Sequence, residues 1–179
     1  MSNNYKIDWN FITKLEGGNH HQGYQPTKNS GVTIATGFDL KEKTPQSLKI
    51  MGFDDILIGK LEPYLGLTGS KAKGFAPNLI LDDVDTDKIN YLSKIYYAND
   101  ISKQYFKASQ EKDFKQLEAP KQTVVASVGF QYGSLNRTPK FLGAVVEDRW
   151  KDVIKELRNF GDDFNTRRNI EADYLEERL

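Results

Sequence analysis

Two acidic residues near the N-terminus are placed where they could act together on a glycosidic bond. Glu16 ends the apolar helix expected over residues 8–15, on the same side as Trp9. Asp39 closes the extended segment GVTIATGFDL. The negative end of the helix dipole and partial burial both favour the protonated form of Glu16. A protonated carboxyl can donate to a glycosidic oxygen while an ionised carboxylate activates water, so the pair predicts glycoside hydrolysis.

Each of these carboxylates also has an ordinary structural explanation. Glu16 would only fix the fold if it paired with an arginine, and an aspartate after a strand often forms a turn or caps a helix. The catalytic interpretation of Asp39 is strengthened by the nearby Thr33. Alternation along VTIATGF places Thr33 on one face of the strand, where its hydroxyl lies beside Asp39 if the strand bends near Gly37.

Other common catalytic and cofactor motifs are missing from the sequence. His20 and His21 are adjacent within a loop expected over residues 19–31, which is not the helical i, i+4 spacing of a zinc site, and no HExxH motif occurs. A GxSxG nucleophile elbow, a Walker loop and a Rossmann glycine fingerprint are also absent. We therefore predict neither a metal site nor a cofactor.

The composition is that of one globular domain without thiol chemistry. The chain has 179 residues, of which 38% are hydrophobic and 28% charged, and it contains no cysteine. A formal net charge of zero gives no field that would attract nucleic acid or an anionic membrane. No apolar run approaches the roughly 20 residues of a membrane span. The segment MSNNYKIDWNF resembles no classical signal peptide, so we expect synthesis in the cytoplasm without one.

Periodic apolar positions predict the elements that would hold the acidic pair. A small sheet or hairpin should follow the first helix, and a long helix over residues 85–106 could connect two lobes. A helix over 119–132, buried on several sides, should end at Gly133. Further helices are expected at 44–52, at 53–63, along a stripe from Val146 to Leu157, and over 162–179.

Several motifs, taken in order, resemble a known family. LEGG, the Gly23-Tyr24 pair, SGVTIATGFDL, PYLGLTG and SVGFQYG look like the phage-lysozyme-like muramidase domain at the C-terminus of the bacteriocin pesticin and in related secreted toxin domains. The resemblance runs from about Trp9 to Leu175. It implies an α+β, mainly helical fold of phage-lysozyme type. A small β-containing lobe and a helical lobe, joined by a long helix, would form one domain over residues 1–179 with a cleft between the lobes.

The resemblance also implies an activity and roles for individual residues. The activity is hydrolysis of the β-1,4 bond between N-acetylmuramic acid and N-acetylglucosamine in peptidoglycan. Glu16 matches the general acid of the family, Thr33 its catalytic threonine and Asp39 its catalytic aspartate. Phage lysozymes place their aspartate before the threonine, so the toxin-like subgroup is the closer match. Three further residues would bind the substrate: Tyr24, Gln131 and Tyr132.

An arginine of the segment NTRRNIEA is a further element of the resemblance. Arg167 or Arg168 lies in the region from which phage lysozymes send an arginine to their catalytic glutamate. Such a partner would favour the ionised form of Glu16 and would oppose the effects of the helix dipole and of burial. The sequence does not distinguish the two arginines.

The leading hypothesis is a muramidase in which Asp39 and Thr33 position a water molecule for inversion at the anomeric carbon. Inversion needs carboxyl groups roughly 6.5 to 9.5 Å apart, whereas about 5 to 5.5 Å would suit a retaining enzyme. The alternatives are a catalytically inactive glycan-binding or immunity-type module on the lysozyme fold and a secretion-adaptor domain. Because the chain has no net charge, we expect delivery machinery to bring it to the periplasm and cell wall of a target bacterium, and an immunity protein to protect the producer.

Overall fold

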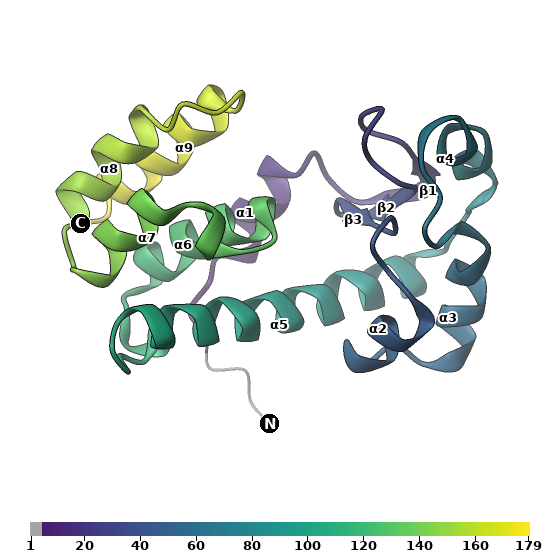
Figure 1. The fold of residues 1–179 in the computed structure, drawn as a ribbon, viewed down its shortest axis with the longest axis horizontal. Helices are drawn as coiled ribbons and strands as arrows, with labels where there is room; N and C mark the ends of the chain where they lie inside the picture. The colour runs from purple at the N-terminus through teal and green to yellow at the C-terminus, as the bar shows by residue number, and fades with distance from the viewer. Residues whose placement is uncertain (1–4) are drawn as a thin grey trace. The chain divides into compact units, whose positions relative to one another are not determined.

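The computed structural model describes residues 5–179, which form two compact units (Figure 1). Of these residues, 5–12 and 97–179 make up unit 1, and 13–96 make up unit 2. Most elements in this part of the chain are helices, and the strands form one small antiparallel sheet. This confirms the α+β, mainly helical class. The prediction of a single domain over 1–179 with a cleft between two lobes stays a prediction.

Helices supply most of the secondary structure of residues 5–179. The α-helices are, in chain order, α1 (Trp9–Leu15), α2 (Pro45–Ile50), α3 (Asp55–Leu61), α4 (Gly69–Phe75), α5 (Asp83–Ala108), α6 (Ala119–Tyr132), α7 (Pro139–Val146), α8 (Trp150–Arg158) and α9 (Asn165–Glu176). Short 3-10 helices are η1 (Glu62–Tyr64), η2 (Ala76–Asn78), η3 (Phe114–Gln116) and η4 (Leu135–Arg137). None of the helices in the described part of the chain is long and apolar enough to cross a membrane.

Unit 2 contains a three-stranded antiparallel sheet in the order β1 (His20–Tyr24), β2 (Thr33–Ala35) and β3 (Phe38–Asp39). The strand expected from VTIATGF bends into a hairpin, whose turn includes Gly37 with a φ of +71°. The bend near this glycine, on which the expected placement of Thr33 beside Asp39 depended, is therefore present. The loop expected over residues 19–31 is wrong in its first part, because β1 occupies it. HHQGY has no alternating apolar pattern, and its extended form depends on pairing with β2 and on the Gly23 N–H bond to Leu79 O (2.8 Å).

The core of unit 2 lies between the sheet and its helices. Thr44 caps α2 through a capping box with Ser47, and Asp54 caps α3 by accepting from the Leu57 N–H. Both caps follow the sequence signals for helix starts at these positions. Helix α4 was not among the predicted elements, since the segment GSKAKGF buries only Ala72 and shows no apolar stripe. Buried side chains of this core include Val32, Ile34, Phe38, Leu40, Leu48, Leu57, Leu61 and Ile89.

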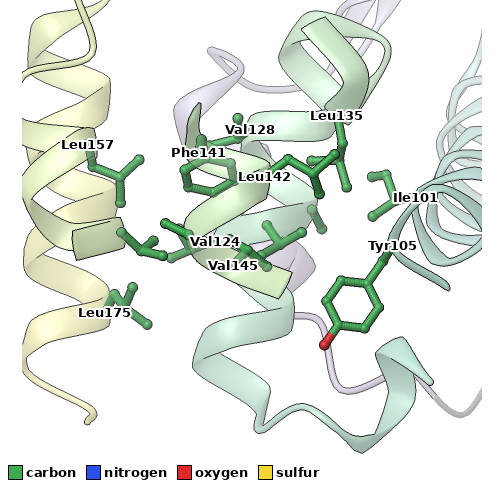
Figure 2. Packing of buried hydrophobic residues seen from close by; sticks show 14 of the residues in the cluster. Ile101, Tyr105, Val124, Val128, Leu135, Phe141, Leu142, Val145, Leu157 and Leu175 are labelled. Carbon is green, nitrogen blue, oxygen red and sulfur yellow. The ribbon is translucent and has the colours of Figure 1, made fainter. Parts of the chain in front are cut away.

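Unit 1 is built around α6, which is buried on several sides as predicted and ends at Gly133 in the left-handed conformation. Figure 2 shows Ile101 and Tyr105 of α5 on one side of its hydrophobic cluster and Leu157 and Leu175 of α8 and α9 on the other. The stripe predicted from Val146 to Leu157 is wrong as one helix. Val146 ends α7 and a separate helix begins at Trp150, because the Asp148 backbone has a φ of +57° between them.

A buried polar network links α6 to α9 within unit 1. Glu171 has no exposed surface, and it accepts from Ser127 Oγ at 2.5 Å and from Arg167 Nε at 3.1 Å. Arg168, equally buried, binds the other oxygen of Glu171 and reaches Asp162 Oδ2 at 3.1 Å. Burial raises the pKa of the Glu171 carboxyl, and the guanidinium of Arg168 opposes that rise. The network therefore depends on every member being present.

We expect Glu171→Ala to lower the free energy of unfolding by about 3–5 kcal/mol, because it leaves a buried guanidinium without its carboxylate. The melting temperature should fall by about 10 °C, measured by circular dichroism. Glu176→Ala is the matched control on the same helix, since its carboxylate is exposed and its ion pair with Arg158 lies at the surface. Equal melting temperatures for the two variants would contradict a stabilising role of the network.

Candidate functional site

Three side chains form a row across the sheet of unit 2. Thr33 is paired in register with Tyr24 on β1 and with Asp39 on β3. Directly opposite residues of antiparallel strands share one face, with Cβ atoms about 4.5–5.5 Å apart. The threonine and aspartate that sequence reasoning placed together are therefore neighbours, and the substrate-binding candidate Tyr24 lies on the other side of Thr33.

The hydroxyl of Thr33 is the unusual member of the row. The residue is only 2% exposed, and its Oγ1 has no hydrogen-bond partner within residues 5–179. Buried hydroxyls in proteins are nearly always hydrogen-bonded, so this one has capacity for a hydrogen bond to a water molecule or a ligand hydroxyl. This hydroxyl can both donate and accept.

The carboxylate of Asp39 is held by backbone amides. Its Oδ1 accepts from the Lys41 N–H at 2.8 Å and from the Gly31 N–H at 3.1 Å, and its Oδ2 lies 3.2 Å from the same Gly31 nitrogen. A Cβ on Gly31 would lie 2.7 Å from Asp39 Oδ1, closer than real side chains come. Glycine at this position is therefore what allows the backbone to approach the carboxylate.

Glu16 follows α1 directly, as expected for an acid at the helix end. The chain leaves the helix through Gly17 and Gly18, with φ values of +84° and +97°. The half-buried carboxyl of Glu16 lies against the β2–β3 turn, since a Cβ on Gly37 would be 3.2 Å from its Oε2. The turn that brings Asp39 back beside Thr33 thus also leaves room for Glu16.

The pKa of Tyr24 depends on both acids. Burial raises the pKa of its phenol, and the negative charges of Glu16 and Asp39 raise it further. The structure therefore brings together Glu16, Thr33, Asp39 and Tyr24 within unit 2. Two carboxyl groups are the pair that acid-assisted hydrolysis of a glycosidic bond uses, and the Thr33 hydroxyl lies beside one of them.

A hydrogen-bond chain from α5 holds the loop after Glu16 and the turn after β2. Asn90 accepts from the Thr36 N–H at 3.0 Å and donates to Asn19 Oδ1 at 3.0 Å, and Asn19 donates to Thr86 Oγ1 at 3.2 Å. Sequence reasoning missed these positioning residues. Asparagine is a poor helix former, so its presence within a long helix was a signal that Asn90 makes a specific contact.

The other two substrate-binding candidates belong to unit 1. Gln131 is half-buried, and Tyr132 donates from its hydroxyl to Asp162 Oδ2 at 2.7 Å. Burial and this hydrogen bond raise the pKa of Tyr132 to about 12. Their role in binding sugar stays a prediction, as does an interaction of Arg167 or Arg168 with Glu16. Between residues 5 and 179, no group of three or more histidine, aspartate or glutamate side chains is arranged to hold a metal ion.

The mainly helical fold with its small antiparallel sheet is that of a lysozyme-like protein of phage type. The model of the Pesticin family, described as bacterial toxin homologue of phage lysozyme, C-terminal, matches residues 6–151. The chain therefore belongs to this family, which confirms the resemblance seen in the motifs. No curated protein matches the chain. Family membership supports a lysozyme-like muramidase in general terms, with peptidoglycan as the substrate.

Proposed function

We propose that this protein is a muramidase that cleaves the β-1,4 bond between N-acetylmuramic acid and N-acetylglucosamine, with Glu16, Asp39 and Thr33 as its catalytic residues. Family membership supports the general activity. The observation that carries the assignment of residues is the sheet register, which sets Thr33 beside Asp39, together with the position of Glu16 against Gly37. Tyr24, Gln131 and Tyr132 are the proposed sugar-binding residues.

In this mechanism Glu16 protonates the leaving oxygen while Asp39 accepts a proton from an attacking water. The two backbone amides fix Asp39 but leave acceptor capacity, because two carboxylate oxygens offer about four lone-pair sites. The buried Thr33 hydroxyl supplies a second contact to the same water. Attack by a water from the face opposite Glu16 inverts the anomeric carbon.

The biological role we propose is that of an antibacterial toxin. The family is described as a toxin homologue of phage lysozyme, and a neutral chain is not drawn to an anionic wall by its bulk charge. The protein would then act in the periplasm and cell wall of a target bacterium, reach it through secretion or other delivery machinery, and be neutralised by an immunity protein in the producer.

Mass spectrometry of the soluble products from purified peptidoglycan tests the proposed activity. Fragments with reducing N-acetylmuramic acid ends are the expected result. Products with 1,6-anhydro ends would instead identify a lytic transglycosylase. If no fragments are released while the protein sediments with peptidoglycan, an inactive glycan-binding domain takes the place of the enzyme. If it neither releases fragments nor binds peptidoglycan, an adaptor role becomes the better assignment.

Gly31→Ala tests the positioning of Asp39 without changing any catalytic group. The added Cβ would lie 2.7 Å from Asp39 Oδ1 and 2.8 Å from Lys41 N, so the carboxylate must move. We expect kcat for peptidoglycan hydrolysis to fall about 100-fold, which is typical of a misplacement near 1 Å. Gly74→Ala on α4 is the control, because its Cβ would meet no atom within 4 Å. If Gly31→Ala has the same kcat as this control, the position of Asp39 does not matter for the reaction and its catalytic role is contradicted.

A further inference from the structure

A pocket of about 480 Å³ opens beside Tyr24 in unit 2. Residues 23–28, at the end of β1 and in the following loop, form one wall, and Lys73, Ala76 and Pro77 form the other. Its volume lies within the range of sites for small ligands, about 300–1,000 Å³. Because Tyr24 lines this pocket and also stands in the row with Thr33 and Asp39, a ligand in the pocket would adjoin the candidate site.

The walls of this pocket are tied to each other by hydrogen bonds. The Gly23 N–H donates to Leu79 O at 2.8 Å, and Gln22 Nε2 donates to Pro77 O at 2.9 Å. Gln25 Nε2 donates both to Ser30 O at 2.9 Å and to Gly69 O at 3.2 Å, which connects the loop to α4. The pocket is therefore a feature of the folded unit, built before any ligand arrives.

The charged side chains that line the pocket are both cationic, Lys28 and Lys73. Neither makes an ion pair or a side-chain hydrogen bond within the part of the chain that the structure describes. Three other lysines of unit 2 have acidic partners: Lys49 with Asp55, Lys60 with Asp85, and Lys88 with Asp54. Lys14 and Lys71 have none among residues 5–179 either, so what distinguishes Lys28 and Lys73 is that both line the same pocket. In a chain with no net charge, two unpaired ammonium groups at one pocket favour an anionic ligand.

We propose that this pocket binds the carboxylates of the peptide that peptidoglycan carries on its N-acetylmuramic acid. The inference rests on the proposed function, because it identifies the anion as a part of the substrate. A sugar bound at the row of Tyr24 would carry its peptide substituent into the adjoining pocket. Lys28 and Lys73 would meet the carboxylates, and Pro26, Ala76 and Pro77 would pack against the alanine methyl groups of the peptide.

The test compares two soluble substrates, glycan strands with their peptides and the same strands after an amidase has removed them. The amidase leaves the lactyl carboxylate on the sugar, so the substrates differ in the peptide. For Lys28→Gln/Lys73→Gln, we expect kcat/KM to fall about tenfold on peptide-bearing strands at low salt and to stay near wild type on amidase-treated strands. Lys71→Gln/Lys103→Gln is the control, since it removes the same charge from exposed positions outside the pocket.

Each other outcome overturns the inference in a recognisable way. An equal loss on both substrates would mean that the lysines act on the sugar chain or its lactyl group. An unchanged kcat/KM on peptide-bearing strands would mean that the pocket does not take part, while hydrolysis by the wild type would still uphold the proposed function.

A binding measurement keeps the pocket testable if the wild type cleaves neither substrate. The released tetrapeptide, titrated into ¹⁵N-labelled protein, should shift the amide signals of residues 23–25, 27 and 28 in the wild type and not in Lys28→Gln/Lys73→Gln. Such shifts would support the pocket even without catalysis. If the wild type shows no shifts, the pocket does not bind the peptide and the inference is overturned.

Discussion

Glu16→Gln is expected to lower kcat for peptidoglycan hydrolysis by about 10³-fold, within the range that general acid catalysis contributes. Glutamine has the same shape, so it can keep the contact of this side chain with the β2–β3 turn at Gly37. Its amide cannot give a proton to the leaving sugar oxygen. KM should change little, because the lost interaction belongs to the transition state.

A substrate with an activated leaving group tests whether Glu16 acts as the general acid. A dinitrophenyl glycoside needs no proton on its leaving oxygen, so Glu16→Gln should cleave it nearly as well as the wild type while failing on peptidoglycan. Glu42→Gln, an exposed acid of the same unit, is the control for the loss of one charge. If Glu16→Gln stays within tenfold of the wild type on peptidoglycan, with unchanged circular dichroism, another residue must be the acid.

The parts of the site that the sequence predicted were those fixed by local chemistry. Asp8 accepts from the Phe11 N–H at 3.0 Å and starts α1, and the two glycines after Glu16 end it, as their residue types indicated. The bend at Gly37 likewise follows from a residue that tolerates a positive φ. These signals were enough to place Glu16 at a helix end and Thr33 beside Asp39.

The parts that the sequence did not predict depend on contacts between distant segments. β1 carries two histidines and a glutamine, and it becomes a strand because β2 and the segment around Leu79 pair with it. The register that brings Tyr24 opposite Thr33 is a property of that pairing, which no single segment encodes. The link from Asn90 to Thr36 spans 54 positions in the chain, so an asparagine within a helix indicates that a contact exists but does not identify its partner.

The same distinction applies to Arg168 and Glu171, which the sequence placed within a helix expected over residues 162–179 without indicating their burial. Charged residues in a terminal helix usually face solvent, and here both have no exposed surface. Their burial is possible because each pairs with the other and because Ser127 and Asp162 supply further partners. Both residues lie on α9, and their burial depends on contacts with other segments, such as the hydrogen bond from Ser127 of α6, which the sequence of α9 alone does not show.

Asp39→Asn should lower kcat by about 10³-fold, because an amide cannot take the proton of the attacking water. The fold around it should persist, since the amide oxygen can still accept from Gly31 N and Lys41 N, the two donors of Asp39 Oδ1. Asp55→Asn, at an exposed carboxylate of α3, is the control.

The anomer formed first by the wild type then decides how Asp39 acts. If it positions water, proton NMR during the first turnovers should show the α-anomer of N-acetylmuramic acid at the new reducing end. The β-anomer, together with a 2-fluoro sugar trapped on Asp39, would make this residue a nucleophile. That result would also change the role of Thr33, since its unpartnered hydroxyl would then face a covalently bound sugar rather than the attacking water.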